Sequence, residues 1–161
     1  MTQAAIFQLL ESVTDPEIPV LTIADLGIIR SVNVSETGVQ IVITPTYSGC
    51  PAMNEIEKNI REMLDNHGVK NVTVLSVLSP AWTTDWMTES GKKKLMAYGI
   101  APPLSPTADK KALMGETRQV TCPNCKSTHT QMQTPFGSTA CKALFKCLDC
   151  LEPFDYFKCL R

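Results

Sequence analysis

Apolar residues recur at helical spacing in two parts of the first hundred residues. One part is residues 2–13, and the other follows Pro51, which suits the first position of a helix because proline lacks an N–H. The second apolar stripe ends at the Asn-His-Gly sequence of residues 66–68, where glycine favours the end of a helix. A shorter helix is expected over about 86–97. These patterns predict helices that each bury one face.

The segments between the predicted helices have the character of strands. Residues 28–34 and 39–44 alternate between apolar and polar, and the turn at 35–38 joins them into a predicted hairpin. Residues 72–78 are apolar at nearly every position, which predicts a strand buried on both faces. Together these elements indicate an α/β fold in which helices pack on a small mixed sheet. We place this first domain at residues 1–98.

The rest of the chain differs in composition from the first domain. Residues 99–117 contain three prolines among serine, threonine, lysine and glycine, which is typical of a linker. Residues 118–161 hold six of the seven cysteines and are expected to form a second, smaller domain. Its short strands are expected near 118–121, 128–134, 143–147 and 154–158.

Two cysteine pairs in this tail have the spacing of a metal site. Cys122 and Cys125 form one Cys-x-x-Cys knuckle, Cys147 and Cys150 form another, and 21 residues separate the two knuckles. Two thiols at this spacing can curl onto one ion, and the second knuckle completes a tetrahedron. Cys141, six residues before Cys147, is a reserve ligand. Zinc is the common ion at such sites, although four thiolates also suit iron.

Charge is distributed unevenly along the chain, although the net formal charge is only −1. Residues 1–117 carry 9 Lys and Arg against 13 Asp and Glu, whereas residues 118–161 carry 6 against 3. The small net charge argues against a dedicated nucleic-acid-binding protein. The basic tail is either an ordinary solvated surface or a contact for an acidic partner, RNA or DNA.

No stretch of the sequence resembles a secretory signal, and none approaches the ~18 apolar residues that a membrane span needs. Seven cysteines without an export signal indicate metal and thiol chemistry in a reducing compartment rather than disulfides. We therefore expect a cytoplasmic protein with no membrane association.

Cys50 is the remaining candidate for chemistry, because it is expected at the N-cap of the second helix. Unpaired amides and the dipole at a helix N-terminus stabilise an anion, which would lower the pKa of the thiol. The alternative is a small buried residue at a tight turn. Asp15, Glu17 and Asp25 flank an earlier loop and could ligate a metal or move protons, or could serve only as turn residues.

An independent catalytic centre has little support in the sequence. There is no Gly-rich phosphate loop, no Ser-His-Asp arrangement and no site of histidines with carboxylates. Neither His67 nor His129 is placed by the sequence to act as a base for Cys50. The chain is therefore expected not to be an enzyme.

Several longer motifs resemble known families. The first domain is similar to iron–sulfur assembly factors of the SufT type in three segments: 15–19, 23–30 and 44–51. The chain as a whole resembles the PaaD family, also called PaaJ, the fourth protein of the bacterial phenylacetyl-CoA ring-epoxidase set. This second resemblance rests on the ribbon cysteines and on three segments: 82–86, 136–144 and 152–158.

The resemblance implies a SufT-like domain followed by a zinc ribbon, and an accessory role in maturing or delivering iron–sulfur or metal cofactors for the epoxidase. It implies that Cys50, with Asp15 and Asp25 beside it, is a cluster-transfer or partner-facing site that holds a transient iron–sulfur cluster. The implied partners are the oxygenase and iron–sulfur reductase subunits of the epoxidase. A homodimer is also compatible with this reading.

Other functions remain open at this point. The protein could be a structural subunit of the epoxidase complex without transfer chemistry. It could be an enzyme that uses Cys50 as a nucleophile, or a zinc ribbon that binds nucleic acid. The absence of a base for Cys50 and the small net charge make the last two the weaker alternatives.

Overall fold

The computed structural model describes residues 1–104 and 119–158. The chain divides into two compact units, Met1–Gly91 and Lys92–Arg161. This division falls earlier than the expected domain end at residue 98, and it passes through helix α3 (Glu89–Tyr98). None of the helices in the described residues is long and apolar enough to cross a membrane.

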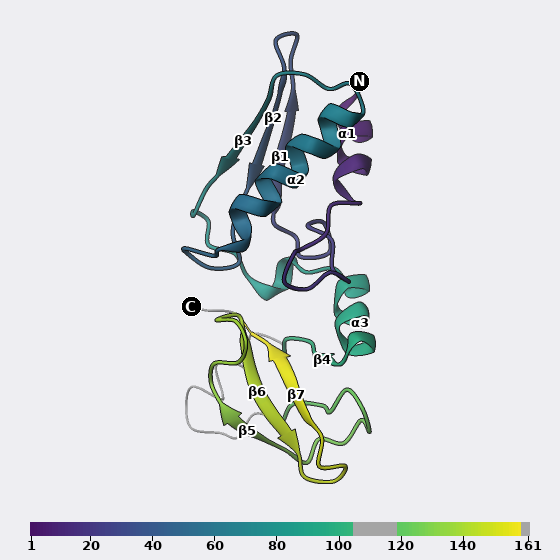
Figure 1. Cartoon of the computed structure of the whole chain (residues 1–161), viewed down its shortest axis with the longest axis vertical. Coiled ribbons are helices and arrows are strands. Elements are labelled where there is room, and N and C mark those ends of the chain that lie inside the picture. Colours follow the sequence, from purple (N-terminus) through teal and green to yellow (C-terminus); the bar gives the residue numbers. More distant parts are fainter. Residues whose placement is uncertain (105–118, 159–161) are drawn as a thin grey trace. The chain divides into compact units, whose positions relative to one another are not determined.

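The first unit is a three-stranded sheet covered on one face by two helices (Figure 1). Its elements, in chain order, are α1 (Gln3–Leu10), β1 (Ile29–Val34), β2 (Val39–Ile43), α2 (Ala52–Asn66), β3 (Val72–Ser76) and a 3-10 turn (Thr84–Trp86). The strand order is β1-β2-β3, with β1 antiparallel and β3 parallel to β2. The sheet is therefore mixed, and the α/β expectation for this domain is confirmed.

The core of the first unit lies between the sheet and its helices. Strand β2 alternates, so that Val39, Ile41 and Ile43 are buried while Gln40 is exposed. The apolar stripe of α2 packs above these side chains, and its members are fully or almost fully buried: Met53, Ile56, Ile60 and Leu64. The alternating residues of strand β2 and the helically spaced residues of α2 thus contribute to the same apolar core.

Strand β3 differs from its sequence expectation. Only Val74 is buried along it, and the Leu75 side chain is 42% exposed. The strand lies at the edge of a sheet that has helices on one face only, so that its second face meets solvent. The prediction that this strand is buried on both faces was therefore wrong. A run of apolar residues in the sequence does not show whether a second layer of structure covers the strand.

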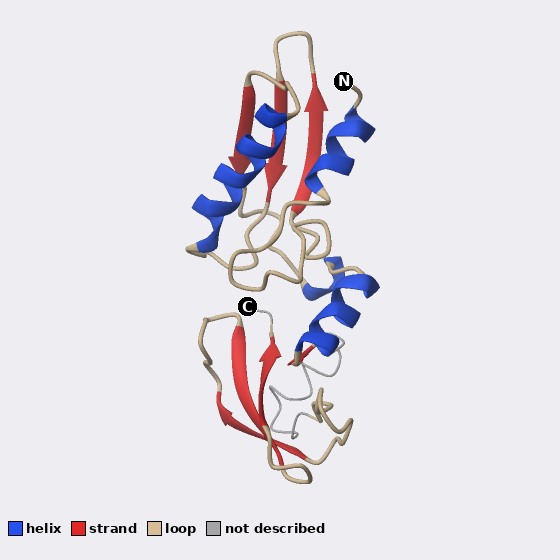
Figure 2. Ribbon diagram, turned by 45° about the vertical axis from the view of Figure 1, so that its right-hand side comes forward, coloured by secondary structure: helices blue, strands red, loops and turns tan. Residues whose placement is uncertain are grey.

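The second unit is a four-stranded sheet of order β4-β7-β6-β5 (Figure 2). Its strands are β4 (Ile100–Ala101), β5 (Thr130–Thr134), β6 (Lys142–Cys147) and β7 (Pro153–Phe157). An aromatic cluster forms the centre of its core, where Phe145 stacks on Phe154 at 5.9 Å and meets Tyr156 edge-on at 5.5 Å.

Two expectations for this unit need correction. Residues 119–121 form no strand, while residue 118 and most of the expected linker, 105–117, lie outside the described residues. The first part of that linker is instead ordered as β4, which pairs in parallel with β7. The other three strands lie within two residues of their expected positions.

Candidate metal centre and the Cys50 loop

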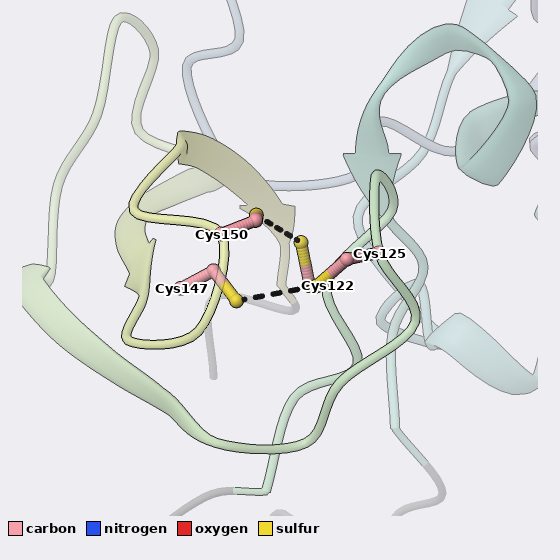
Figure 3. A group of neighbouring side chains, drawn as sticks. All are labelled: Cys122, Cys125, Cys147 and Cys150. Atoms are coloured by element: carbon pink, nitrogen blue, oxygen red, sulfur yellow. Dashed lines mark hydrogen bonds between the residues drawn. The ribbon is translucent and has the colours of Figure 1, made fainter.

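The four knuckle cysteines converge on one point in the second unit (Figure 3). Their sulfur atoms all lie within 4.8 Å of one another, with 3.7 Å between Cys122 and Cys150 and 3.5 Å between Cys125 and Cys147. None of the six described cysteines is in a disulfide. Within residues 1–104 and 119–158, these four are the only group of three or more His, Cys, Asp and Glu side chains that could hold a metal ion.

The spacing of the sulfurs fits a tetrahedral metal ion. A Zn–S bond is about 2.3 Å long, so that sulfurs at the corners of a zinc tetrahedron lie about 3.8 Å apart. The distances within the two sulfur pairs are close to this value, whereas a disulfide would bring two sulfurs to about 2.05 Å. The donor set and its geometry both suit a four-thiolate site.

Two of the cluster thiols, Cys125 and Cys150, have pKa values shifted in opposite directions. The N–H of Ser127 lowers the pKa of Cys125, but the contact of Cys125 with Cys147, desolvation and the contacts with Cys150 and Cys122 together raise it to about 12. The N–H of Glu152 lowers the pKa of Cys150 to about 7. Four thiolates at this separation repel one another, so a cation is needed to hold all four deprotonated.

Asp149 links the two knuckles. Its carboxylate accepts a hydrogen bond from the hydroxyl of Ser127 and contacts Nδ1 of His129 at 3.0 Å. These two hydrogen bonds hold the pKa of Asp149 below its ordinary value. The N–H of Leu148 also donates to the carbonyl of His129 at 2.9 Å. His129 is thus a supporting residue of the site.

The reserve ligand Cys141 is not among the four converging sulfurs. It is buried just before β6, whereas Cys147 ends that strand, and six residues of strand span about 20 Å. The hydroxyl of Thr139 lies 3.1 Å from its sulfur. Cys159 lies outside the described residues.

Cys50 lies in the first unit, on the loop between β2 and α2. Helix α2 begins at Ala52 with Pro51 as its N-cap residue, so Cys50 is one position further from the helix than expected. Its side chain is half-buried. The carbonyl of Cys50 still accepts a hydrogen bond from Met53 N–H at 3.3 Å, which joins the loop to the first turn of the helix.

The pKa of the Cys50 thiol is raised, contrary to the sequence expectation. Burial is the largest cause, and the negative charges of Glu17 and Asp15 add to it. Hydrogen bonds from the N–H of Ala52 and the side chain of Tyr47 lower the pKa, but by less. The helix N-terminus therefore acts as predicted, and desolvation outweighs it. The thiol is protonated at neutral pH.

Both carboxylates predicted beside Cys50 organise turns. Asp15 accepts hydrogen bonds from the N–H groups of Glu17 and Ile18, both at 2.8 Å. Asp25 accepts from the N–H of Thr22 at 3.1 Å and from the hydroxyl of Thr88 at 3.0 Å. These bonds account for the burial of the two acids, which is costly without hydrogen-bond donors. The charge of Asp15 nevertheless reaches Cys50, as the raised pKa of the thiol indicates.

A second group of contacts joins the segment at the start of β1 to the segment between β3 and α3. The indole N–H of Trp82 donates to the carbonyl of Leu26 at 2.8 Å, and the guanidinium of Arg30 lies 3.7 Å from the ring centre of Trp86. Gly27 has a positive φ of 66°, and a Cβ there would lie 2.0 Å from the carbonyl oxygen of Trp86. Sequence reasoning could not pair these distant segments.

Comparison with known families covers both units. Residues 3–75 match the family described as iron–sulfur cluster assembly protein, and residues 106–158 match the PaaD zinc beta ribbon domain. A solved structure of a domain of unknown function, DUF59, from Bacillus anthracis is 28% identical with a TM-score of 0.55. That similarity covers 58% of this chain and 90% of the solved one.

Curated relatives extend the comparison to nearly the whole chain. An iron–sulfur protein maturation auxiliary factor from Porphyromonas gingivalis is 36% identical over 58% of this chain and 90% of its own. A protein of Escherichia coli K12, named as a putative subunit of 1,2-phenylacetyl-CoA epoxidase, is 49% identical over 96% of this chain and 92% of its own. The resemblance expected from the motifs is confirmed, and the chain belongs to the PaaD family of putative phenylacetyl-CoA epoxidase subunits.

Proposed function

We propose that this protein is a non-catalytic accessory component that matures or delivers iron–sulfur or other metal cofactors for the phenylacetyl-CoA epoxidase system. Membership of the PaaD family and the assembly-type first unit support this role. The observation that carries it is the pair of unlike thiol environments. Four sulfurs form a compact cluster, while Cys50 is a half-buried thiol in the other unit.

The chemistry of Cys50 suits temporary binding. Because its pKa is raised, a soft metal ion or a cluster must displace a proton from the thiol to bind there. One thiol also leaves most coordination positions to be filled by the donor or the client protein. Both features weaken the binding of cargo, and weak binding favours its release. Glu17 and Asp15 add negative charge that compensates a cationic cargo.

The ribbon has a different task in this proposal. We assign zinc to its four thiolates, and the metal holds together a small unit whose apolar core is limited. The folded ribbon then presents a fixed surface to the oxygenase or the iron–sulfur reductase component. A reducing compartment such as the cytoplasm would keep all these thiols available.

A structural subunit of the epoxidase, without transfer chemistry, is the second candidate. It is favoured by the hydrogen bonds of Asp15 and Asp25, since both carboxylates are occupied in turns. Under this alternative the protein would purify with the oxygenase in a fixed ratio, and replacing Cys50 would have no effect on the epoxidase.

The deciding experiment replaces Cys50 in cells that grow on phenylacetate as their sole carbon source. Cys50→Ser should accumulate as a folded, metal-loaded protein and should abolish growth. Cys141→Ser, which changes a buried thiol outside the metal cluster, is the matched control and should grow normally. Wild-type growth of the Cys50→Ser strain would exclude transfer through this thiol.

A further inference from the structure

The two metal knuckles share one backbone turn. In each of them, the residue five positions after the first cysteine accepts a hydrogen bond from the N–H of that cysteine, at 2.8 Å in the first knuckle and 3.0 Å in the second. The N–H of this residue donates to the sulfur of the second cysteine in the same knuckle. The residue is Ser127 in the first knuckle and Glu152 in the second. Ser127 and Glu152 therefore hold equivalent positions beside the metal site.

The side chains at these two positions differ in what they contact. The hydroxyl of Ser127 donates to the carboxylate of Asp149, in the opposite knuckle, and accepts from the N–H of His129 at 3.0 Å. Together with its backbone contacts, every polar group of Ser127 is therefore engaged. Glu152 is exposed and, within the part of the chain that the structure describes, its carboxylate has no hydrogen bond or ion pair. The two knuckles are thus joined through the side chain of Ser127 but not through that of Glu152.

The cysteine that Ser127 supports is the most accessible of the four. Cys125 is exposed, whereas the other three cysteines of the site are buried or partly buried. A chelator or a competing thiol meets Cys125 first, so exchange of a bound ion would begin with the detachment of this ligand. An N–H directed at a thiolate stabilises its negative charge. Because Asp149 fixes the hydroxyl of Ser127, it also keeps the N–H of Ser127 directed at Cys125.

We propose that Asp149, acting through the hydroxyl of Ser127, is a positioning residue that holds Cys125 in place as a metal ligand and so slows release of the ion. Residues that orient metal ligands commonly change metal affinity by about ten- to a hundredfold. This clamp, formed by Asp149 and Ser127, keeps the resident ion of the ribbon apart from any cargo handled at Cys50. The inference goes beyond the proposed function and does not depend on it, because it concerns the ribbon alone.

The test follows the transfer of zinc from the full-length, zinc-loaded protein to an excess of a coloured chelator. Ser127→Ala and Asp149→Ala should each bind one zinc ion per chain and release it at least about tenfold faster than the wild type. Because both residues act through one hydrogen bond, the double variant should release zinc no faster than the faster single variant. Ser127→Thr keeps the hydroxyl and should release zinc as slowly as the wild type.

Two controls separate the clamp from charge and from loss of a ligand. Glu152→Ala removes the same charge from the second knuckle without breaking a side-chain hydrogen bond, and it should release zinc like the wild type. The absorption bands of cobalt(II) bound to four thiolates should be present in every variant, since all four cysteines remain.

Release at the wild-type rate from both Ser127→Ala and Asp149→Ala would overturn the proposal. Equal acceleration in Glu152→Ala would also overturn it, because charge rather than the hydrogen bond would then control release. If the effects of the two single changes multiply in the double variant, the two residues act separately and the clamp is wrong. Should Asp149→Ala fail to bind zinc, the comparison of Ser127→Ala with Ser127→Thr decides the question.

Discussion

The hydroxyl of Thr88 donates a hydrogen bond to Asp25, 63 residues earlier in the chain, at 3.0 Å. The other carboxylate oxygen of Asp25 accepts from the N–H of Thr22, and the Thr22 hydroxyl accepts from the N–H of Asp25. Thr88 in turn accepts from the N–H of Gly91. Asp25 thus joins the loop before β1 to the first turn of α3.

This position predicts a structural effect of replacing Asp25. Asp25→Ala leaves donors at Thr22 and Thr88 without their acceptor, and it should lower the free energy of unfolding by about 1–3 kcal/mol in urea titrations. Glu36→Ala, at the exposed hairpin turn, is the control and should change stability by less than ~0.5 kcal/mol. Unchanged stability of Asp25→Ala would show that the carboxylate has no such role and would return it to the candidate site.

The raised pKa of Cys50 predicts how its reactivity depends on pH. Because the thiolate is the reactive form and its pKa is raised, the rate of alkylation should rise about tenfold per pH unit through the neutral range without levelling off there. A rate that levels off below pH 8 would contradict the direction of the shift. The measurement uses mass spectrometry of the Cys50 peptide after iodoacetamide treatment.

Two variants should move this pKa in opposite directions. Glu17→Gln removes a negative charge that raises the pKa of Cys50, so the thiol should react faster at pH 7.5. Tyr47→Phe removes a hydrogen bond that lowers the pKa, so the thiol should react more slowly. If both variants shift the rate in the same direction, access to the thiol rather than its charge controls the reaction.

Removal of the metal should affect the two units differently. A strong chelator should unfold the ribbon, because four crowded thiols lose the cation that compensates their charge. The first unit has a separate core and should keep its cooperative unfolding transition. Cys147→Ser should reproduce the loss of metal, whereas Cys141→Ser should retain one ion per chain. Metal analysis and circular dichroism distinguish these results, and full metal content in Cys147→Ser would refute the ligand set.

The features that the sequence predicts well depend on short-range spacing. The two Cys-x-x-Cys knuckles curl locally, so their spacing alone identified Cys122, Cys125, Cys147 and Cys150 as sulfurs that converge. The helices and the hairpin of the first unit follow from local periodicity in the same way. The family motifs added the identity of both domains.

The features that the sequence missed depend on contacts between distant segments. The hydrogen bonds from Thr88 to Asp25 and from Ser127 to Asp149 join residues far apart in the chain. No pattern of neighbouring residues predicts either of them. The pKa of Cys50 was predicted from its helix alone, whereas burial and the charge of Glu17 decide its direction. Long-range packing also determines which strands lie at an edge.

The role proposed for Cys50 is to supply cofactors to the epoxidase system. The most direct measurement is the iron and sulfide content of the reductase component purified from cells that carry Cys50→Ser, compared with cells that carry the wild-type protein or Cys141→Ser. We expect a reductase that has lost most of its cluster in the Cys50→Ser cells and a normal one in both controls. A fully loaded reductase in the Cys50→Ser cells, with the variant protein present and folded, would contradict this role.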